Sequence, residues 1–133
     1  MSGPLEGLTI VDASQVMPGA IASVLLADHG AEVIKVEPPG GAYFAHDLPR
    51  ASWDRGKKSV TLDLRAEGDR ATLKQLIARA DIFLHSLTAE EAARLGLDQA
   101  ALAKENAGIV VCALMAYGSE APFADRPYGE SLA

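Results

Sequence analysis

The sequence predicts an α/β fold: a Rossmann-like, doubly wound, mainly parallel sheet of about five strands with helices on both faces. Three successive segments indicate this fold, namely an apolar run at 8–11, a helix-forming segment at 20–28 and a β-branched run at 32–37. A strand, a helix and a second strand within about 30 residues form a βαβ unit. Such sheets bind ligands at the carboxyl ends of their strands, which here are residues 12–19 and 37–41.

Local signals mark each element of this unit. The first run is apolar and partly β-branched, which is typical of a strand buried on both faces. The helical segment places apolar residues at the i, i+3, i+4 spacing of one helix face, namely Ile21, Val24 and Leu25. We expect this helix to follow a break at Pro18 and to end at Gly30, because glycine adopts the left-handed conformation that closes helices.

The rest of the chain continues the alternation. Strands are predicted at 59–64, 81–85 and 108–114, and helices at 69–80, 89–96 and 100–105. Thr88 and Glu91 form a capping box, and Asp98 caps the last helix. The run at 108–114, GIVVCAL, is almost wholly apolar, so we expect it in the centre of the sheet.

The segment 42–58 shows no periodicity, and a long connection of this kind is often a binding loop. Its basic end contains Arg55, Lys57 and Lys58. These cations either bind phosphate groups or form a solvated turn before the next strand, and the sequence leaves both interpretations open.

Composition excludes several classes of protein. The net charge of −6 argues against general nucleic-acid binding, and no apolar run is long enough to predict a transmembrane helix. The start, MSGPLEG, lacks the form of a secretory signal. The single cysteine, Cys112, cannot form an internal disulfide, so we expect a reduced, cytoplasmic protein in which this thiol is buried and inert. No residues have metal-ligand spacing, so no metal site is expected.

Individual polar residues do not identify a reaction. The 12–19 loop contains one glycine, Gly19, in place of the G-x-G-x-x-G of dinucleotide-binding folds, which disfavours NAD. Glu37 is either a ribose ligand or a solvated strand-end carboxylate. His85 ends a strand, where a local hydrogen bond is expected. These residues alone predict an α/β domain with a ligand crevice and leave its chemistry open.

The motifs taken in order resemble the opening of the family III CoA-transferases, which include formyl-CoA transferase, carnitine CoA-transferase and α-methylacyl-CoA racemase. The matching segments are PLEGLTIVDASQVMPGAIASVLLADHGAEVIKVEPPGG, RGKKSVTLDL, LIARADIFLHS, RLGLD and AYGSEAPFADRP, and they cover nearly all 133 residues. The resemblance implies a Rossmann-like portion of a larger fold in which two chains interlock as a homodimer. It also implies acyl-CoA and a small carboxylic acid as substrates, with coenzyme A as the group carrier.

Transferases of this family pass the acyl group through an anhydride on an aspartate, which is nucleophilic catalysis by a carboxylate. The resemblance places that aspartate beyond residue 133. We therefore expect residues 1–133 to be the CoA-binding portion and to be inactive alone. Glu130 stands where transferases have an acidic residue near the site, so it is the catalytic candidate within the chain.

The resemblance also indicates which residues contact CoA. Val16 and Met17 stand where the first loop of the family meets CoA, and Leu62 suits the apolar wall beside adenine. Arg94 keeps the basic residue of the RLG motif. Together with the two basic-segment lysines, the predicted cofactor-binding residues are Val16, Met17, Lys57, Lys58, Leu62, Ser86, Leu87 and Arg94.

At several positions the sequence departs from the family pattern. Met17 replaces a glutamine of many transferases, Pro38 replaces an arginine that often contacts the nucleotide, and Ser86 and Leu87 replace an Asn-Phe pair. Gly129 stands where racemases carry a catalytic histidine, which argues against racemase chemistry. Two alternatives therefore stay open: a degenerate paralogue that acts as an interaction module, and a nucleotide-binding domain of an oxidoreductase.

Overall fold

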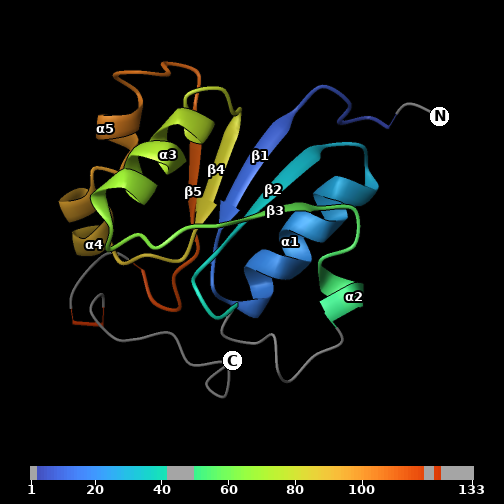
Figure 1. The fold of residues 1–133 in the computed structure, drawn as a ribbon, viewed down its shortest axis with the longest axis horizontal. Helices are drawn as coiled ribbons and strands as arrows, with labels where there is room; N and C mark the ends of the chain where they lie inside the picture. Colours follow the sequence, from blue (N-terminus) through green and yellow to red (C-terminus); the bar gives the residue numbers. More distant parts are fainter. Residues whose placement is uncertain (1–2, 42–49, 119–121, 124–133) are drawn as a thin grey trace.

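A single five-stranded, wholly parallel sheet organises the computed structural model, which describes residues 3–41, 50–118 and 122–123. The strand order is β3-β2-β1-β4-β5 (Figure 1). The strands are β1 (Thr9–Ala13), β2 (Glu32–Glu37), β3 (Lys58–Thr61), β4 (Ile82–His85) and β5 (Val110–Ala113). The order reverses direction at β1, so the carboxyl ends of β1, β2 and β4 meet at a topological switch point.

Helices cover both faces of this sheet, as a doubly wound fold requires. The helices are α1 (Met17–Asp28), α2 (Arg50–Trp53), α3 (Glu67–Ile77), α4 (Ala89–Leu95) and α5 (Gln99–Leu102). Figure 1 shows α1 and α2 on one side and α3, α4 and α5 on the other. Successive residues of β1 point to opposite faces of the sheet. Ile10 packs on the face covered by α1, and Val11 packs with Leu73 and Ile77 of α3 on the other face. The predicted fold class is therefore confirmed.

The first βαβ unit is as predicted except at the start of its helix. β1 is buried on both faces, and β2 pairs with it in parallel. The break expected at Pro18 is wrong, because α1 begins at Met17 with proline in its first turn, where the missing N–H costs no hydrogen bond. Gly19 is needed there, since a Cβ on it would lie 1.9 Å from Oγ of Ser14.

Later elements differ from prediction mainly in length. α3 starts and ends earlier than expected, and β3 is shorter than the predicted strand. The capping box is confirmed, since Thr88 accepts from the backbone of Glu91 and the Glu91 side chain accepts in return. The short α2 was not predicted, and residues 42–49 of the expected binding loop lie outside the described residues. No helix of the described segments is long and apolar enough to cross a bilayer.

The prediction for the last strand is wrong. β5 is an edge strand rather than a central one, and its Val110, Cys112 and Ala113 are exposed. An apolar run shows that a strand needs cover, but it does not show what provides that cover. The expectation that Cys112 is buried is therefore wrong as well.

We expect the isolated chain to self-associate through β5, because an apolar strand at the edge of the described sheet can pair with a strand of another chain. Val110 is 57% exposed on this edge. Val110→Lys should shift the sedimentation profile toward monomer, since a lysine blocks edge pairing. Gln75→Lys, which adds the same charge to an exposed site on α3, should leave the profile unchanged. A strictly monomeric profile of the unmodified chain at high concentration would contradict this expectation.

Candidate functional site

A cavity of about 250 Å³ opens at the carboxyl ends of the parallel strands. Segments that follow β1, β2, β3 and β4 all contribute to it. The residues around it are Ala13, Gln15, Val36, Pro38, Pro39, Leu62, Asp63, Leu64, Arg65, Ser86 and Leu87. This is the edge where doubly wound sheets bind ligands. Because the pockets that bind drug-sized ligands measure about 300–1,000 Å³, this cavity would hold one part of a large cofactor rather than the whole.

Apolar side chains make most of the cavity wall, and a charged pair stands at its mouth. The Arg65 guanidinium is 89% exposed and donates to Asp63 from Nε at 3.0 Å and from Nη2 at 3.1 Å. These bonds lower the pKa of Asp63 and raise the pKa of Arg65, so both groups are charged at neutral pH. The mouth of the cavity therefore presents an exposed guanidinium beside an ionised carboxylate.

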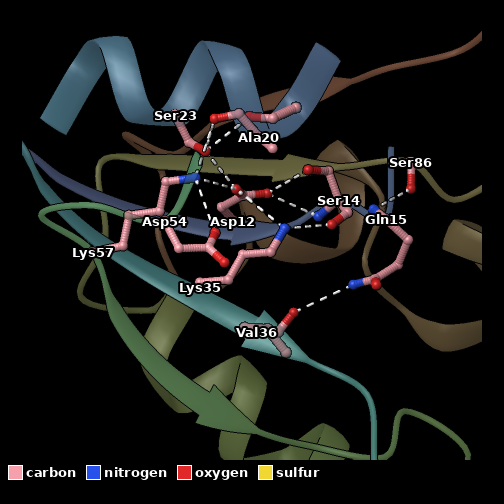
Figure 2. A network of polar contacts seen from close by, with 11 residues as sticks. Asp12, Ser14, Gln15, Ala20, Ser23, Lys35, Val36, Asp54, Lys57 and Ser86 are labelled. Carbon is pink, nitrogen blue, oxygen red and sulfur yellow. Dashed lines mark hydrogen bonds and ion pairs between the residues drawn. The ribbon is translucent and has the colours of Figure 1, made fainter. Parts of the chain in front are cut away.

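Beneath the loop that follows β1, the buried carboxylate of Asp12 organises a network of polar contacts (Figure 2). Its Oδ1 accepts from the backbone N–H of Ser14 at 2.9 Å and from the Ser14 hydroxyl at 2.6 Å. Its Oδ2 accepts from the Ser23 hydroxyl at 2.6 Å. Asp12 thus ties the loop after β1 to helix α1.

Two lysines bring positive charge to this carboxylate. Lys35 pairs with Asp12 in the β1–β2 register, and its ammonium lies 3.4 Å from Oδ2 and donates to the Ser14 carbonyl at 2.5 Å. The Lys57 ammonium lies 4.0 Å from Asp12 Oδ2 and 3.7 Å from Asp54 Oδ1, and donates to the Ala20 carbonyl at 3.1 Å. Burial lowers the pKa of Lys57, and Lys35 lowers it further, against the opposing effect of the two aspartates.

Gln15 links this polar network to the cavity, because it follows Ser14 in the chain and lines the cavity wall. Its backbone N–H donates to the Ser86 hydroxyl at 2.9 Å, which joins the loop after β1 to the loop after β4. Its side-chain Nε2 donates to the carbonyl of Val36 on β2 at 3.3 Å. Three neighbouring strands are therefore connected through one residue at the cavity (Figure 2).

The structure brings together some of the predicted cofactor-binding residues and separates others. Leu62, Ser86 and Leu87 line the cavity. The residues that do not line it are Val16, Met17, Lys57, Lys58 and Arg94. Contact with CoA stays a prediction for all eight, and the catalytic candidate Glu130, like Gly129, lies outside the described residues.

The side chains of the three cations in the basic segment have separate partners and do not form one cluster. The Lys57 side chain points into the buried network. Lys58 is the first residue of β3, and its ammonium pairs with the carboxylate of Glu32 at 2.7 Å. Arg55 pairs with Asp28. The geometry therefore does not support the interpretation of this segment as one phosphate-binding cluster. It also does not support a solvated turn at Lys57, because that side chain is buried.

Sequence reasoning did not single out Gln15, Asp63 or Arg65, which all line the cavity. Gln15 lies in the predicted ligand-binding segment 12–19 and Arg65 directly follows the predicted strand 59–64, whereas Asp63 lies within that predicted strand. The solvated interpretation of Glu37 is wrong, because its side chain is buried. The expected local hydrogen bond of His85 is confirmed, since Leu87 N–H donates to Nδ1 at 3.2 Å. Among residues 3–41, 50–118 and 122–123, no three His, Cys, Asp or Glu side chains gather as a metal-binding group.

Comparison with known proteins identifies the family. The model of CoA-transferase family III matches residues 5–131. The chain belongs to CoA-transferase family III.

Curated relatives in this family are longer proteins. The chain is 33% identical to acetyl-CoA:oxalate CoA-transferase of Acetobacter aceti, over 98% of this chain and 36% of that protein. It is 36% identical to the probable fatty acyl-CoA transferase Rv3272 of Mycobacterium tuberculosis, over 93% of this chain and 34% of that protein. The chain thus spans about a third of the length of these relatives.

A solved structure agrees with the fold of this family III chain. The crystal structure of a mutant of Rv3272 from Mycobacterium tuberculosis superposes with a TM-score of 0.88 at 34% identity. The match covers 98% of this chain and 38% of that chain. The fold of this chain therefore corresponds to part of a longer family III structure.

Lys35→Met should destabilise the fold strongly, because it leaves the buried Asp12 carboxylate without its strand-paired cation. Removing one partner of a buried ion pair costs about 3–5 kcal/mol of unfolding free energy. Lys58→Met, which breaks the exposed pair with Glu32, should cost less than about 1 kcal/mol. Urea unfolding of both variants measures the difference, and equal losses would show that the Asp12 network does not stabilise the fold.

Stability should fall as the pH decreases below the ordinary pKa of histidine. Burial lowers the pKa of His85 from its usual 6.5, so in acid the unfolded chain binds a proton that the folded chain does not. His85→Gln should flatten this part of the pH profile, whereas His29→Gln, at an exposed site, should not. The free energy of unfolding, measured in urea at about pH 5 and pH 7.5, tests this. The expectation is refuted if the difference between the two pH values is the same in His85→Gln as in the unmodified chain.

Proposed function

We propose that this chain is the CoA-binding portion of a transferase that moves CoA between an acyl-CoA thioester and a carboxylic acid. The observation that supports this proposal is the cavity at the switch point of the sheet, in a chain of family III. Three residues that the resemblance assigns to CoA line that cavity, namely Leu62, Ser86 and Leu87. Membership of the family supports CoA transfer as the chemistry, and the cavity supports a place for the cofactor.

The chemistry of the cavity suits one part of a CoA molecule. Val36, Leu62 and Leu87 offer apolar surface to a base or to a pantetheine chain. Arg65 at the mouth offers a planar guanidinium, which recognises phosphate through several donors. Asp63 holds this guanidinium in place through two hydrogen bonds until a phosphate competes for it.

For the reaction we propose an aspartyl anhydride. An aspartate carboxylate attacks the thioester carbonyl and the CoA thiolate leaves, which forms a mixed anhydride. The acceptor carboxylate attacks the aspartyl carbonyl of this anhydride, which releases the donor carboxylic acid and leaves an anhydride between the aspartate and the acceptor. The CoA thiolate then attacks the acceptor carbonyl of the second anhydride, which gives the new thioester and the free aspartate carboxylate. Two described aspartates are unsuited to this role, because Asp12 is buried in its network and Asp63 is held by Arg65.

We therefore propose that the nucleophile belongs to a segment of the enzyme outside residues 1–133, and that the active enzyme is a homodimer. The chain spans about a third of its relatives, which is consistent with a catalytic group supplied from elsewhere. Turnover of acetyl-CoA with oxalate, succinate or carnitine by the proposed full-length enzyme, which contains residues 1–133 and the segment with the nucleophile, tests transfer. CoA binding without any transfer would instead identify a non-catalytic paralogue of the family.

Leu87→Glu should weaken CoA binding about tenfold, because it places a negative charge beside a polyanionic ligand in the cavity wall. Leu76→Glu is the matched control, since Leu76 is also a half-buried leucine of the same apolar cluster but does not line this cavity. Isothermal titration calorimetry measures both. The proposal fails if the unmodified chain gives no binding heat at millimolar CoA, or if both variants lose affinity equally.

A further inference from the structure

Gln15 has an amide group with only one end satisfied. Its Nε2 donates to the Val36 carbonyl at 3.3 Å, but its Oε1 is buried and has no hydrogen-bond partner among the described residues. The residue lines the cavity, and its backbone is fixed by the Ser86 hydroxyl at 2.9 Å. A buried acceptor is therefore held in a defined position beside the place where a ligand would sit.

The orientation of this amide follows from its partner. The Val36 carbonyl can only accept a hydrogen bond, so the amide nitrogen of Gln15 faces it and the oxygen faces away. Figure 2 shows the nitrogen directed at Val36 and the oxygen on the other side of the amide. Turning the amide over would place two carbonyl oxygens against each other.

A second glutamine shows how this chain satisfies an amide that has a structural role. Gln99 donates from Nε2 to the Ile109 carbonyl at 3.1 Å, and its Oε1 accepts from the Val111 N–H at 3.1 Å. Both ends of Gln99 are therefore used by the backbone. The contrast matters because buried polar atoms in native proteins almost always have a partner, from protein, water or ligand.

We propose that Gln15 is a specificity-determining residue of the cavity, whose Oε1 accepts a hydrogen bond from a donor group of CoA. This inference rests on the proposed function. A ligand that offers a donor here satisfies the amide, whereas a ligand that offers an acceptor meets the Gln15 oxygen with its own lone pairs. CoA has such donors in both halves: the amino group and hydroxyl of its adenosine half, and the amides and hydroxyl of its pantetheine half.

The test removes the acceptor and measures each half of the ligand separately. Gln15→Met keeps an unbranched side chain of similar length but has no strong acceptor. By calorimetry on the full chain, CoA affinity should fall about five- to tenfold, the loss expected for one hydrogen bond. The half that carries the donor, either adenosine 3′,5′-bisphosphate or 4′-phosphopantetheine, should weaken by the same factor, and the other half should be unchanged.

Gln99→Met is the matched control, since it removes two hydrogen bonds to the backbone of Ile109 and Val111, which do not line the cavity. It should lower the melting temperature and leave CoA affinity unchanged. The inference is overturned if Gln15→Met binds CoA as the unmodified chain does, or if both half-ligands weaken equally, which would indicate a purely structural role. If the unmodified chain does not bind CoA, the proposed function fails first and this inference fails with it.

A crystal structure of the CoA complex provides a test that needs no variant. We expect Gln15 Oε1 within about 3.2 Å of a ligand nitrogen or oxygen that carries a hydrogen. An Oε1 that contacts only carbon atoms of bound CoA would overturn the inference while leaving the proposed function intact.

Discussion

The arrangement depends on one buried carboxylate. Asp12 is inaccessible to solvent, and so is most of Lys35, which faces it from the neighbouring strand. Charges removed from water are costly unless they are paired and hydrogen-bonded, and here the carboxylate oxygens accept from Ser14 and Ser23 as well. Removal of Lys35 would leave the buried carboxylate without its nearest cation, and removal of either serine would leave it short of a hydrogen bond. The network therefore favours the observed geometry of the loop that follows β1.

The network around Asp12 also fixes the backbone that enters the cavity, because Ser14 and Gln15 are adjacent in the chain. Ser14 is held by both Asp12 and Lys35, so Gln15, the next residue, enters the cavity from a fixed point. Gln15 then joins β2 through Val36 and the loop after β4 through Ser86. A site held by buried contacts on rigid strands is preorganised, so less of the binding energy is lost in ordering it. The charge network thus helps to fix the position of Gln15 in the cavity.

Local patterns predicted the fold well, because strand periodicity, helix faces and capping depend on neighbours in sequence. The βαβ unit and the box formed by Thr88 and Glu91 are examples. The predictions failed where distant residues decide the outcome. Lys57 belongs to a basic run, yet its ammonium lies beside Asp12, a contact that only tertiary structure creates. The apolar sequence of β5 likewise does not reveal that the strand stands at an edge. The sequence placed Gln15 in a ligand-binding segment but did not distinguish it from its neighbours, since its importance comes from an acceptor that the described part of the fold leaves unsatisfied.

We propose that CoA occupies the preorganised cavity at the carboxyl ends of the strands. Amide hydrogen exchange with and without CoA, resolved by peptide, tests it most directly. If CoA binds there, we expect slower exchange in the segments 13–16, 36–39, 62–65 and 86–88, which surround the cavity, and unchanged exchange in α5. Saturation with CoA that slows exchange only outside these segments would contradict it.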